Sequence, residues 1–342
     1  MKPAPKYAIP TSHDELFDPE WIFAAFDDIA EDEKVVSVDR TGESKTRAEK
    51  LRFAVTVDGP NGRRTNHYCA KVFVDGTFTG GPTEARFYRD LAPRLGLRLA
   101  RVPYAAVDGE RPVIVMEDLE IRGGAFQSPH FPISPASART TLSQLARLHA
   151  TTWGLSAVED IEWLGVSVTS AAFFTDAPTL QSLLDDGRAE GFPAELRSGV
   201  NLANALTVHR SFERTCVLHG DTHTGNIYLD ADGLGLFFDW ETIQIGNWGQ
   251  DVAYHLGASL SIDDRRAHER ELVEHYLREL AANGGPTIDA DEGFELYRRS
   301  FTYGYLLWVI TRIRGRDEVL AHMPRLAAAL DDHQTFKLLG VI

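Results

Sequence analysis

The stretch VLHGDTHTGNIYLDADGLGLFFDWE, residues 217–241, decides how this chain folds and where its chemistry lies. Two short runs rich in strand-forming residues, 227–229 and 234–238, flank the turn sequence DADG, whose glycine can adopt a positive φ. We therefore expect a β-hairpin. Closing it brings Asn226, at the mouth of the first strand, close to Asp239, just past the second.

The polar residues around this hairpin could form a cation site beside a proton acceptor. An Asn amide oxygen and a nearby carboxylate form an all-oxygen site that favours Mg²⁺. Asn226 and Asp239 are therefore the predicted metal ligands. Asp221 lies one loop away, where it can accept a proton from an attacking hydroxyl group.

The same string resembles the protein-kinase-like phosphotransferases, in which a catalytic loop H-R-D-x-x-x-x-N is followed by a hairpin and a second metal-binding Asp. The matching positions are His219-Gly220-Asp221, then Asn226 and Asp239. Gly replaces Arg in the triplet, and Trp-Glu replaces Phe-Gly after the metal-binding Asp. In these departures the chain looks like the small-molecule branch, which holds the aminoglycoside phosphotransferases and the choline and ecdysteroid kinase-like enzymes.

The resemblance implies an α+β, two-lobed protein-kinase-like fold. A small β-rich, nucleotide-binding N-lobe is expected over residues 1–117, and a larger, mostly helical C-lobe over residues 118–342. The implied reaction moves the γ-phosphoryl group of ATP to a hydroxyl group of a small molecule, with Mg²⁺ as cofactor and Asp221 as catalytic base. Backbone groups read the nucleotide base in such folds, so GTP stays open as an alternative to ATP.

One lysine of the N-lobe stands out because it lies in an apolar run. Lys71, within residues 68–74, needs an anionic partner if it is buried. The resemblance implies that Lys71 holds the α- and β-phosphates and pairs with Glu84 near the start of the next helix. Two other interpretations stay open: Lys71 on an edge strand with a solvated ammonium group, and Glu84 as a helix-capping carboxylate.

Two further nucleotide contacts follow from the resemblance. The polar segment 41–46 takes the place of the loop that covers the phosphates, although it lacks G-x-G-x-x-G. Its backbone N–H groups and the Ser44 and Thr46 hydroxyls are the expected phosphate contacts, and an ordinary hairpin loop is the alternative. At the hinge, the Glu117 carbonyl and the Leu119 N–H are expected to read adenine.

The C-lobe sequence also predicts residues that support the site. Ser134 and Pro135 indicate a helix start, and this helix runs to about Trp153 with His149 on its core face. His149 is therefore expected to be a core histidine. The resemblance implies that Asp251, at the start of a later helix, braces the catalytic loop from below.

Two loop histidines are expected to assist the loop without transferring protons. His219 should orient it by hydrogen bonding, and His223 is either a second brace or a contact to the acceptor. An aromatic stripe in the last third of the chain is typical of a core helix, with the lining of an acceptor pocket as the alternative. The stripe comprises Phe294, Tyr297, Phe301, Tyr305 and Trp308.

The composition limits the class of partner. With 342 residues, 43% hydrophobic and 25% charged, the chain is an ordinary globular protein with room for two cores. The net charge of −15 argues against a nucleic-acid partner, because clustered Lys and Arg bind phosphate backbones. It is compatible with a cationic small-molecule acceptor, although solubility alone also accounts for it.

The sequence predicts a cytoplasmic protein without a membrane partner. No apolar run reaches the ~20 residues of a membrane helix, and the first residues, MKPAPKYAIP, lack an apolar signal core. Cys69 and Cys216 are too few for a disulfide framework. Both are expected to be buried, reduced thiols.

Two other functions fit parts of the sequence. His219, Asp221 and His223 could hold zinc in a metallohydrolase, but that interpretation leaves Asn226 and Asp239 without a role. A nucleotide-binding pseudokinase would keep the fold and lack the chemistry. Zinc content distinguishes the first alternative, and turnover with a true acceptor distinguishes the second.

Overall fold

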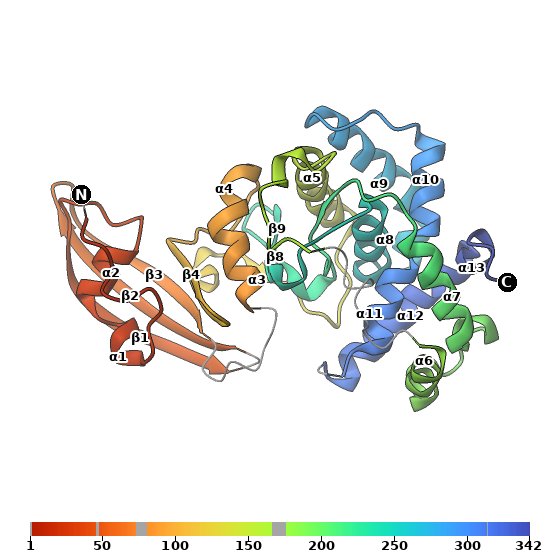
Figure 1. Cartoon of the computed structure of the whole chain (residues 1–342), viewed down its shortest axis with the longest axis horizontal. Coiled ribbons are helices and arrows are strands. Elements are labelled where there is room, and N and C mark those ends of the chain that lie inside the picture. The colour runs from red at the N-terminus through yellow and green to blue at the C-terminus, as the bar shows by residue number, and fades with distance from the viewer. Residues whose placement is uncertain (1, 46–47, 73–80, 166–175, 313) are drawn as a thin grey trace. The chain divides into compact units, whose positions relative to one another are not determined.

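The computed structural model describes residues 2–45, 48–72, 81–165, 176–312 and 314–342. Its contacts divide the chain into two compact units, Met1–Gly124 and Ala125–Ile342. Strands dominate the first unit and helices dominate the second (Figure 1). The α+β class predicted from the sequence is confirmed.

The N-terminal unit is built on a five-stranded antiparallel sheet with the order β1-β2-β3-β5-β4. Its strands are β1 (Lys34–Lys45), β2 (Glu49–Gly59), β3 (Gly62–Val72), β4 (Tyr104–Asp108) and β5 (Arg111–Glu117). The third strand therefore lies inside the sheet, hydrogen-bonded on both sides. This is the strand that carries Lys71.

The first strand is longer than the sequence predicts. The predicted phosphate loop over 41–46 is wrong for residues 41–45, which belong to β1; Ser44, for example, pairs with Lys50 of β2. Pairing with a neighbouring strand satisfies the backbone groups of this polar segment, so it need not form a loop. Thr46 lies outside the described residues.

An aromatic core joins the sheet to the short helices that precede it, α1 (His13–Leu16) and α2 (Pro19–Ala25). Trp21 and Phe26 are almost completely buried, and the Phe26 ring meets Tyr68 of β3 edge to face at 5.1 Å. Fully burying a large apolar side chain stabilises the fold by roughly 1.5–3 kcal/mol. This core therefore anchors β3 in the unit.

A broken helical segment follows the third strand in the chain. It consists of α3 (Gly81–Arg86), a π-helical turn (Phe87–Leu91) and α4 (Ala92–Leu95). The first of these helices packs against β4 and β5 and carries Glu84 in its first turn. A 3₁₀ helix, Leu119–Arg122, closes the unit.

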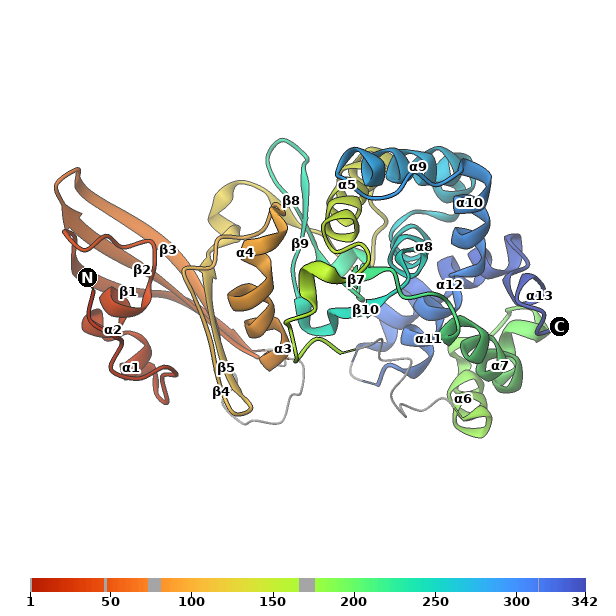
Figure 2. The ribbon, with the colours of Figure 1, turned by 45° about the horizontal axis from the view of Figure 1, so that its top comes forward.

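The C-terminal unit is mostly helical. Its helices are α5 (Pro135–Thr151), α6 (Ala177–Leu183), α7 (Gly199–Arg210), α8 (Trp248–Ser259), α9 (Ile262–Ala282), α10 (Ala290–Arg299), α11 (Thr302–Ile310), α12 (Arg316–Asp332) and α13 (Thr335–Leu338). Helices α5 and α9 lie side by side (Figure 1 and Figure 2). Every residue of α8 is buried, so this helix is the centre of the unit.

Short strands carry the predicted site between these helices. They are β6 (Ala125–Phe126), β7 (Cys216–Leu218), β8 (Ile227–Leu229), β9 (Gly235–Phe237) and β10 (Gln244–Gly246). The predicted hairpin is confirmed, because β8 pairs with β9 and Ile227 lies opposite Phe237. Its turn closes as Asp230 Oδ1 accepts hydrogen bonds from the Asp232 and Leu234 N–H groups, both at 2.9 Å.

Two predictions from composition can be compared with the structure. Among the residues that it describes, none of the helices combines the length and the apolar character needed to cross a bilayer. Both cysteines are free thiols; Cys216 is buried as predicted, whereas Cys69 is only half-buried. Burial raises the pKa of both thiols, so neither is a reactive thiolate.

Candidate active site

A tight loop, residues 219–223, connects β7 to the 3₁₀ helix Thr224–Asn226. Its Gly220 has φ +83°, and a Cβ at this position would lie 2.4 Å from both the Thr242 carbonyl oxygen and Gln244 Nε2. Only glycine combines this backbone conformation with so little space. The glycine in the middle of the triplet is therefore required by the fold of the loop.

The buried carboxylate of Asp251, on α8, holds this loop. Its Oδ2 accepts a hydrogen bond from the His219 backbone N–H at 2.7 Å, and its Oδ1 from the Gly220 N–H at 2.9 Å. Its carbonyl accepts from the Thr222 hydroxyl at 3.0 Å. The predicted brace is confirmed. His149, fully buried as predicted, lies 3.3 Å from the same carboxylate.

The ring of His219 uses both nitrogens inside the loop. Nδ1 accepts a hydrogen bond from the Asp221 backbone N–H, and Nε2 donates one to the Phe238 carbonyl, both at 3.2 Å. Burial lowers the pKa of His219 and favours the neutral ring that this pattern requires. The contacts match the orienting role predicted from the sequence.

His223 is also buried and also braces the loop. Its Nδ1 accepts a hydrogen bond from the Gly225 N–H at 3.0 Å, and its Nε2 faces Asp221 Oδ2 at 3.5 Å. The ring packs edge-on against Trp308 at 5.3 Å. Of the two roles left open by the sequence, these contacts favour the brace.

These bonds converge on the Asp221 carboxylate. Oδ2 accepts from Asn226 Nδ2 at 2.9 Å, and Oδ1 accepts from the Tyr254 hydroxyl at 3.0 Å. Arg314 Nη2 lies 4.0 Å from Oδ2. The side chain of Asp221 nevertheless keeps 21% of its surface exposed, so a small molecule can reach a carboxylate that buried donors hold in place.

The surroundings keep Asp221 ionised. Burial raises the pKa of its carboxyl group, but attraction to His223, the hydrogen bond with that ring and the charge of Arg314 together outweigh burial. The net pKa lies below the ordinary 3.8 of an aspartate. At neutral pH the group is a carboxylate, the form that can accept a proton.

Asn226 links this carboxylate to the end of the hairpin. Its Nδ2 donates to both the carbonyl (2.8 Å) and Oδ2 (2.9 Å) of Asp221, which settles the orientation of the amide and leaves its oxygen as the atom for a cation. The Phe238 N–H donates to the Asn226 carbonyl at 3.2 Å, and Asp239 is the next residue. An amide oxygen and a carboxylate at one end of a hairpin are a donor set that fits Mg²⁺.

The backbone of Asp239 adopts an unusual conformation. Its φ of +65° and ψ of +59° lie in the left-handed region, which few residues other than glycine adopt. Buried Trp240 and the 3₁₀ helix Trp240–Thr242 follow directly. Such strain persists where the surrounding structure enforces it and is concentrated at functional sites, which is consistent with a functional role for this carboxylate.

In the N-terminal unit, Lys71 Nζ donates to Glu84 Oε2 at 2.5 Å, so the predicted ion pair is present. The side chains are 12% and 1% exposed, respectively. Since β3 is an interior strand, the edge-strand interpretation of Lys71 is wrong. The burial of Glu84 likewise argues against a solvent-facing capping carboxylate.

The other predicted nucleotide contacts fall on two parts of this unit. Glu117 ends β5, and Leu119, which is buried, opens the following 3₁₀ helix. The Glu117 side chain accepts hydrogen bonds from the Arg101 N–H (2.8 Å) and from Arg122 (2.9 Å), which fixes the start of this connection. Ser44 is exposed on β1, separated from β5 by two strands.

The zinc interpretation does not fit these contacts. His219 uses one ring nitrogen toward Asp221 and the other toward Phe238, while His223 uses its pair toward Gly225 and Asp221. Within the part of the chain that the structure describes, the loop engages both nitrogens of His219 and Nδ1 of His223, and Nε2 of His223 faces Asp221. These contacts argue against a zinc hydrolase built on these histidines.

Three residues at the site are not predicted from the sequence. Tyr254 and Arg314 approach Asp221, and the Tyr303 hydroxyl donates to the Gly220 carbonyl at 2.8 Å. All three lie far along the chain from the catalytic loop, so no local motif contains them. The one available signal is that Tyr254 follows Asp251 by three residues, a spacing that shares a helix face.

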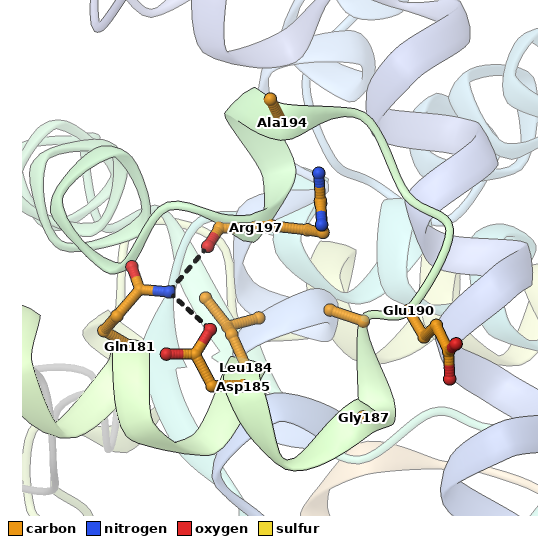
Figure 3. A pocket seen from close by; sticks show the side chains of 8 residues that line it. Gln181, Leu184, Asp185, Gly187, Glu190, Ala194 and Arg197 are labelled. Atoms are coloured by element: carbon orange, nitrogen blue, oxygen red, sulfur yellow. Dashed lines mark hydrogen bonds between the residues drawn. The ribbon is translucent and has the colours of Figure 1, made fainter.

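A pocket of about 520 Å³ lies elsewhere in the C-terminal unit (Figure 3). It is lined by residues between Gln181, on α6, and Arg197. Gln181 Nε2 donates to Asp185 Oδ1 at 2.9 Å and to the Arg197 carbonyl at 3.1 Å. None of the predicted site residues lines it, so this pocket is distinct from the candidate active site.

Comparison with known proteins identifies the fold. No protein of curated function matches the sequence. Among solved structures, an ethanolamine kinase from Plasmodium vivax matches 97% of this chain and 93% of its own, with 14% identity and a TM-score of 0.53. An aminoglycoside phosphotransferase from Alicyclobacillus acidocaldarius (16% identity, 88% and 91% covered, TM-score 0.49) and a choline kinase from Streptococcus pneumoniae (18%, 94% and 100%, 0.48) also match. At such identities the likeness shows the fold alone, and the predicted kinase-like fold is confirmed by the first.

Family membership follows from the sequence itself. Residues 47–293 match the phosphotransferase enzyme family, a span that includes the Lys71–Glu84 pair, the catalytic loop and Asp251. The match covers well over half of the chain and confirms the resemblance noted in its motifs. This chain therefore belongs to the phosphotransferase enzyme family.

Proposed function

We propose that this chain transfers the γ-phosphoryl group of ATP to a hydroxyl group of a small molecule, with Asp221 as the catalytic base. The observation that carries the proposal is the Asp221 carboxylate, which is ionised, partly exposed and hydrogen-bonded to Asn226, a residue at the same end of the hairpin as Asp239. Family membership supports phosphoryl transfer as the reaction class.

In this reaction the acceptor hydroxyl donates a hydrogen bond to the Asp221 carboxylate, which aims the oxygen at the γ-phosphorus. The bond from that oxygen to phosphorus forms, and the bond to the oxygen that bridges the β- and γ-phosphates breaks, so ADP leaves with the electron pair. The hydroxyl proton passes to Asp221. Because the transition state of phosphoryl transfer is loose, the main value of the carboxylate is positioning.

Asn226 and Asp239 would hold Mg²⁺, which, when bound, neutralises charge on the triphosphate. The Asn226 side chain then has two tasks: its nitrogen holds Asp221 and its oxygen binds the cation. One side chain thereby ties the position of the base to the position of the metal.

The N-terminal unit supplies the remaining nucleotide contacts of the proposal. Lys71, paired with Glu84, would bind the α- and β-phosphates, because its ammonium group is a cation with three N–H donors. The Glu117 carbonyl and the Leu119 N–H would read the adenine, and Ser44 would approach the phosphates. Backbone readout does not by itself separate ATP from GTP, so both belong in the assay.

Three observations bear on the chemical class of the acceptor. One solved structure with the same fold is named an ethanolamine kinase, and the net charge of −15 suits a cationic acceptor. Arg314, 4.0 Å from Asp221, adds one constraint. A cationic group of the acceptor must bind on a side away from this guanidinium, because like charges repel.

The test is a thermal-shift titration with ATP and with GTP, each with and without Mg²⁺, on the wild type and on Asp239→Ala. A ligand at 100 times its Kd stabilises a protein by about 2.7 kcal/mol, roughly 4 °C for a chain of this length. We expect a Mg²⁺-dependent shift in the wild type that Asp239→Ala loses. No shift with either nucleotide would exclude the proposed function.

Turnover is the second half of the test. Hydroxyl-bearing acceptors, both cationic and neutral, are screened for phosphate transfer from the nucleotide that gives the shift. Transfer to any acceptor distinguishes an enzyme from a pseudokinase, which would bind the nucleotide and transfer nothing.

A further inference from the structure

A chain of hydrogen bonds leads from α11 to Asp221. Trp308 Nε1 donates to the Tyr254 oxygen at 2.9 Å, and the Tyr254 hydroxyl donates to Asp221 Oδ1 at 3.0 Å. Both aromatic side chains are almost completely buried. Neither has a part in the mechanism described above, although the chain ends on the catalytic base.

The direction of this chain is fixed by chemistry. An indole N–H can only donate, so the Tyr254 oxygen must accept from Trp308. A tyrosine hydroxyl has a single proton, and an ionised carboxylate can only accept, so that proton must point at Asp221. Burial, the Asp221 charge and the hydrogen bond to it raise the pKa of Tyr254 well above its ordinary value, which keeps the phenol protonated.

Tight packing holds both aromatic rings in place. Gly304 on α11 makes room for Tyr254, because a Cβ there would lie 2.5 Å from the tyrosine Cδ2. The Trp308 ring stacks on His322 of α12 at 3.9 Å and 6°. His322 is fixed in turn, with its Nδ1 2.9 Å from the Glu318 carbonyl.

The two oxygens of Asp221 are held unequally. Oδ2 accepts from Asn226 and faces His223 and Arg314, whereas Tyr254 is the donor to Oδ1, and the described residues provide no second one. A carboxylate turns readily about its last bond unless both oxygens are held. The Tyr254 hydroxyl therefore fixes the plane of the carboxylate.

We propose that Tyr254 and Trp308 are positioning residues for phosphoryl transfer, which fix the plane of the Asp221 carboxylate so that it meets the acceptor hydroxyl in one orientation. This inference rests on the proposed function. Tyr254 holds the carboxylate directly, and Trp308 acts through Tyr254. Their contribution falls on turnover and leaves nucleotide binding unchanged, since neither contacts the predicted metal ligands Asn226 and Asp239 in the described contacts.

The test compares Tyr254→Phe and Trp308→Phe with the wild type. Both changes keep an aromatic ring and remove one donor. Tyr305→Phe is the matched control, because it deletes another buried hydroxyl, which donates to the Leu196 carbonyl at 2.8 Å and does not touch Asp221. The probe is Mg²⁺-ATP with water as acceptor, and kcat and KM for ATP are measured from phosphate release.

We expect Tyr254→Phe to lower kcat by about 10- to 100-fold with KM for ATP unchanged, the size of effect typical of a misplaced reacting group. Trp308→Phe should lower kcat less and have no further effect in the Tyr254→Phe background. Tyr305→Phe should match the wild type. If Tyr254 and Trp308 had a purely structural role, their substitution would lower the melting temperature without the selective loss of kcat at unchanged KM.

An NMR measurement tests this chain of hydrogen bonds independently of turnover. The protein has six tryptophans, so the ¹⁵N indole spectrum is simple, and Trp308→Phe identifies its resonance. Tyr254→Phe should shift the Trp308 indole N–H signal, whereas Tyr305→Phe should not.

Two results would overturn the inference in different ways. If the wild type shows Mg²⁺-ATP binding and turnover while Tyr254→Phe matches Tyr305→Phe in kcat, the positioning role is wrong and the proposed function stands. If the wild type shows no Mg²⁺-dependent thermal shift with ATP or GTP, the proposed function fails and the inference fails with it.

Discussion

Asp221 is the residue on which the mechanism depends. Its carboxylate is ionised, held by Asn226 and Tyr254, and partly exposed. Replacing it by asparagine keeps the size of the side chain, removes the base and places an amide N–H₂ among donors. We expect Asp221→Asn to lower phosphoryl transfer from ATP by about 10²- to 10⁴-fold. The thermal shift with Mg²⁺-ATP should stay close to that of the wild type, and near-normal turnover would remove Asp221 from its role.

At the same scale, disrupting the Lys71–Glu84 pair should selectively lower the affinity for the nucleotide. Glu84→Gln removes the buried negative charge that holds Lys71, so the ammonium group loses its fixed position. We expect Mg²⁺-ATP affinity to fall by about tenfold, or ~1.4 kcal/mol, in a fluorescence or calorimetric titration. Asp58→Asn is the control, because its bond to Arg63 is exposed and such pairs contribute little. Equal affinities in the two variants would contradict the role of the pair.

At the scale of elements, two glycines allow the energetic cost of backbone strain to be distinguished from the cost of steric overlap. Gly220 and Gly233 both have positive φ, but only Gly220 has neighbours that a Cβ would strike. Gly233→Ala should therefore cost only the backbone term, about 1–2 kcal/mol. Gly220→Ala adds an overpacking cost of about 1–3 kcal/mol and should also distort the catalytic loop.

Urea denaturation of both glycine variants measures this difference, and turnover is assayed in parallel. Gly233→Ala should keep its activity, because the hairpin turn lies at the far end of β8 and β9 from Asn226. If both variants lose the same free energy of unfolding, the close contacts around Gly220 do not constrain the loop.

The individual elements differ in how well the sequence predicts them. The hairpin of β8 and β9 was predictable because its strands, turn and polar ends are contiguous in the chain. Residues 41–45 were not predictable as strand, since their backbone is satisfied by pairing with β2 and their side chains carry no strand pattern. The bond from Tyr254 to Asp221 was hidden for a related reason: it spans 33 residues and depends on how α8 packs beneath the loop.

For the whole molecule, buried histidines determine how stability responds to acid. His209 and His255 are almost completely buried, and burial lowers the pKa of each from 6.5 to about 4. A group whose folded pKa lies below its unfolded value binds its proton more readily when the chain unfolds. Above about pH 6.5 both histidines are neutral in the folded and in the unfolded chain, so their protonation does not change the free energy of unfolding. As the pH falls from 6.5 toward 4, protonation of the unfolded chain lowers the free energy of unfolding.

This loss should be separable from the response of Asp221. The lowered pKa of Asp221 stabilises the fold above its ordinary value of 3.8, and that contribution is lost only below it. Between pH 6.5 and 4, His209 and His255 contribute to the decline, at most about 3 kcal/mol for each at pH 4. We expect urea midpoints to fall steadily from pH 7 to 4.5 and His209→Gln to flatten the slope. His130→Gln, at an exposed position, is the control, and a slope that stays unchanged in His209→Gln would mean that His209 is protonated in the folded protein.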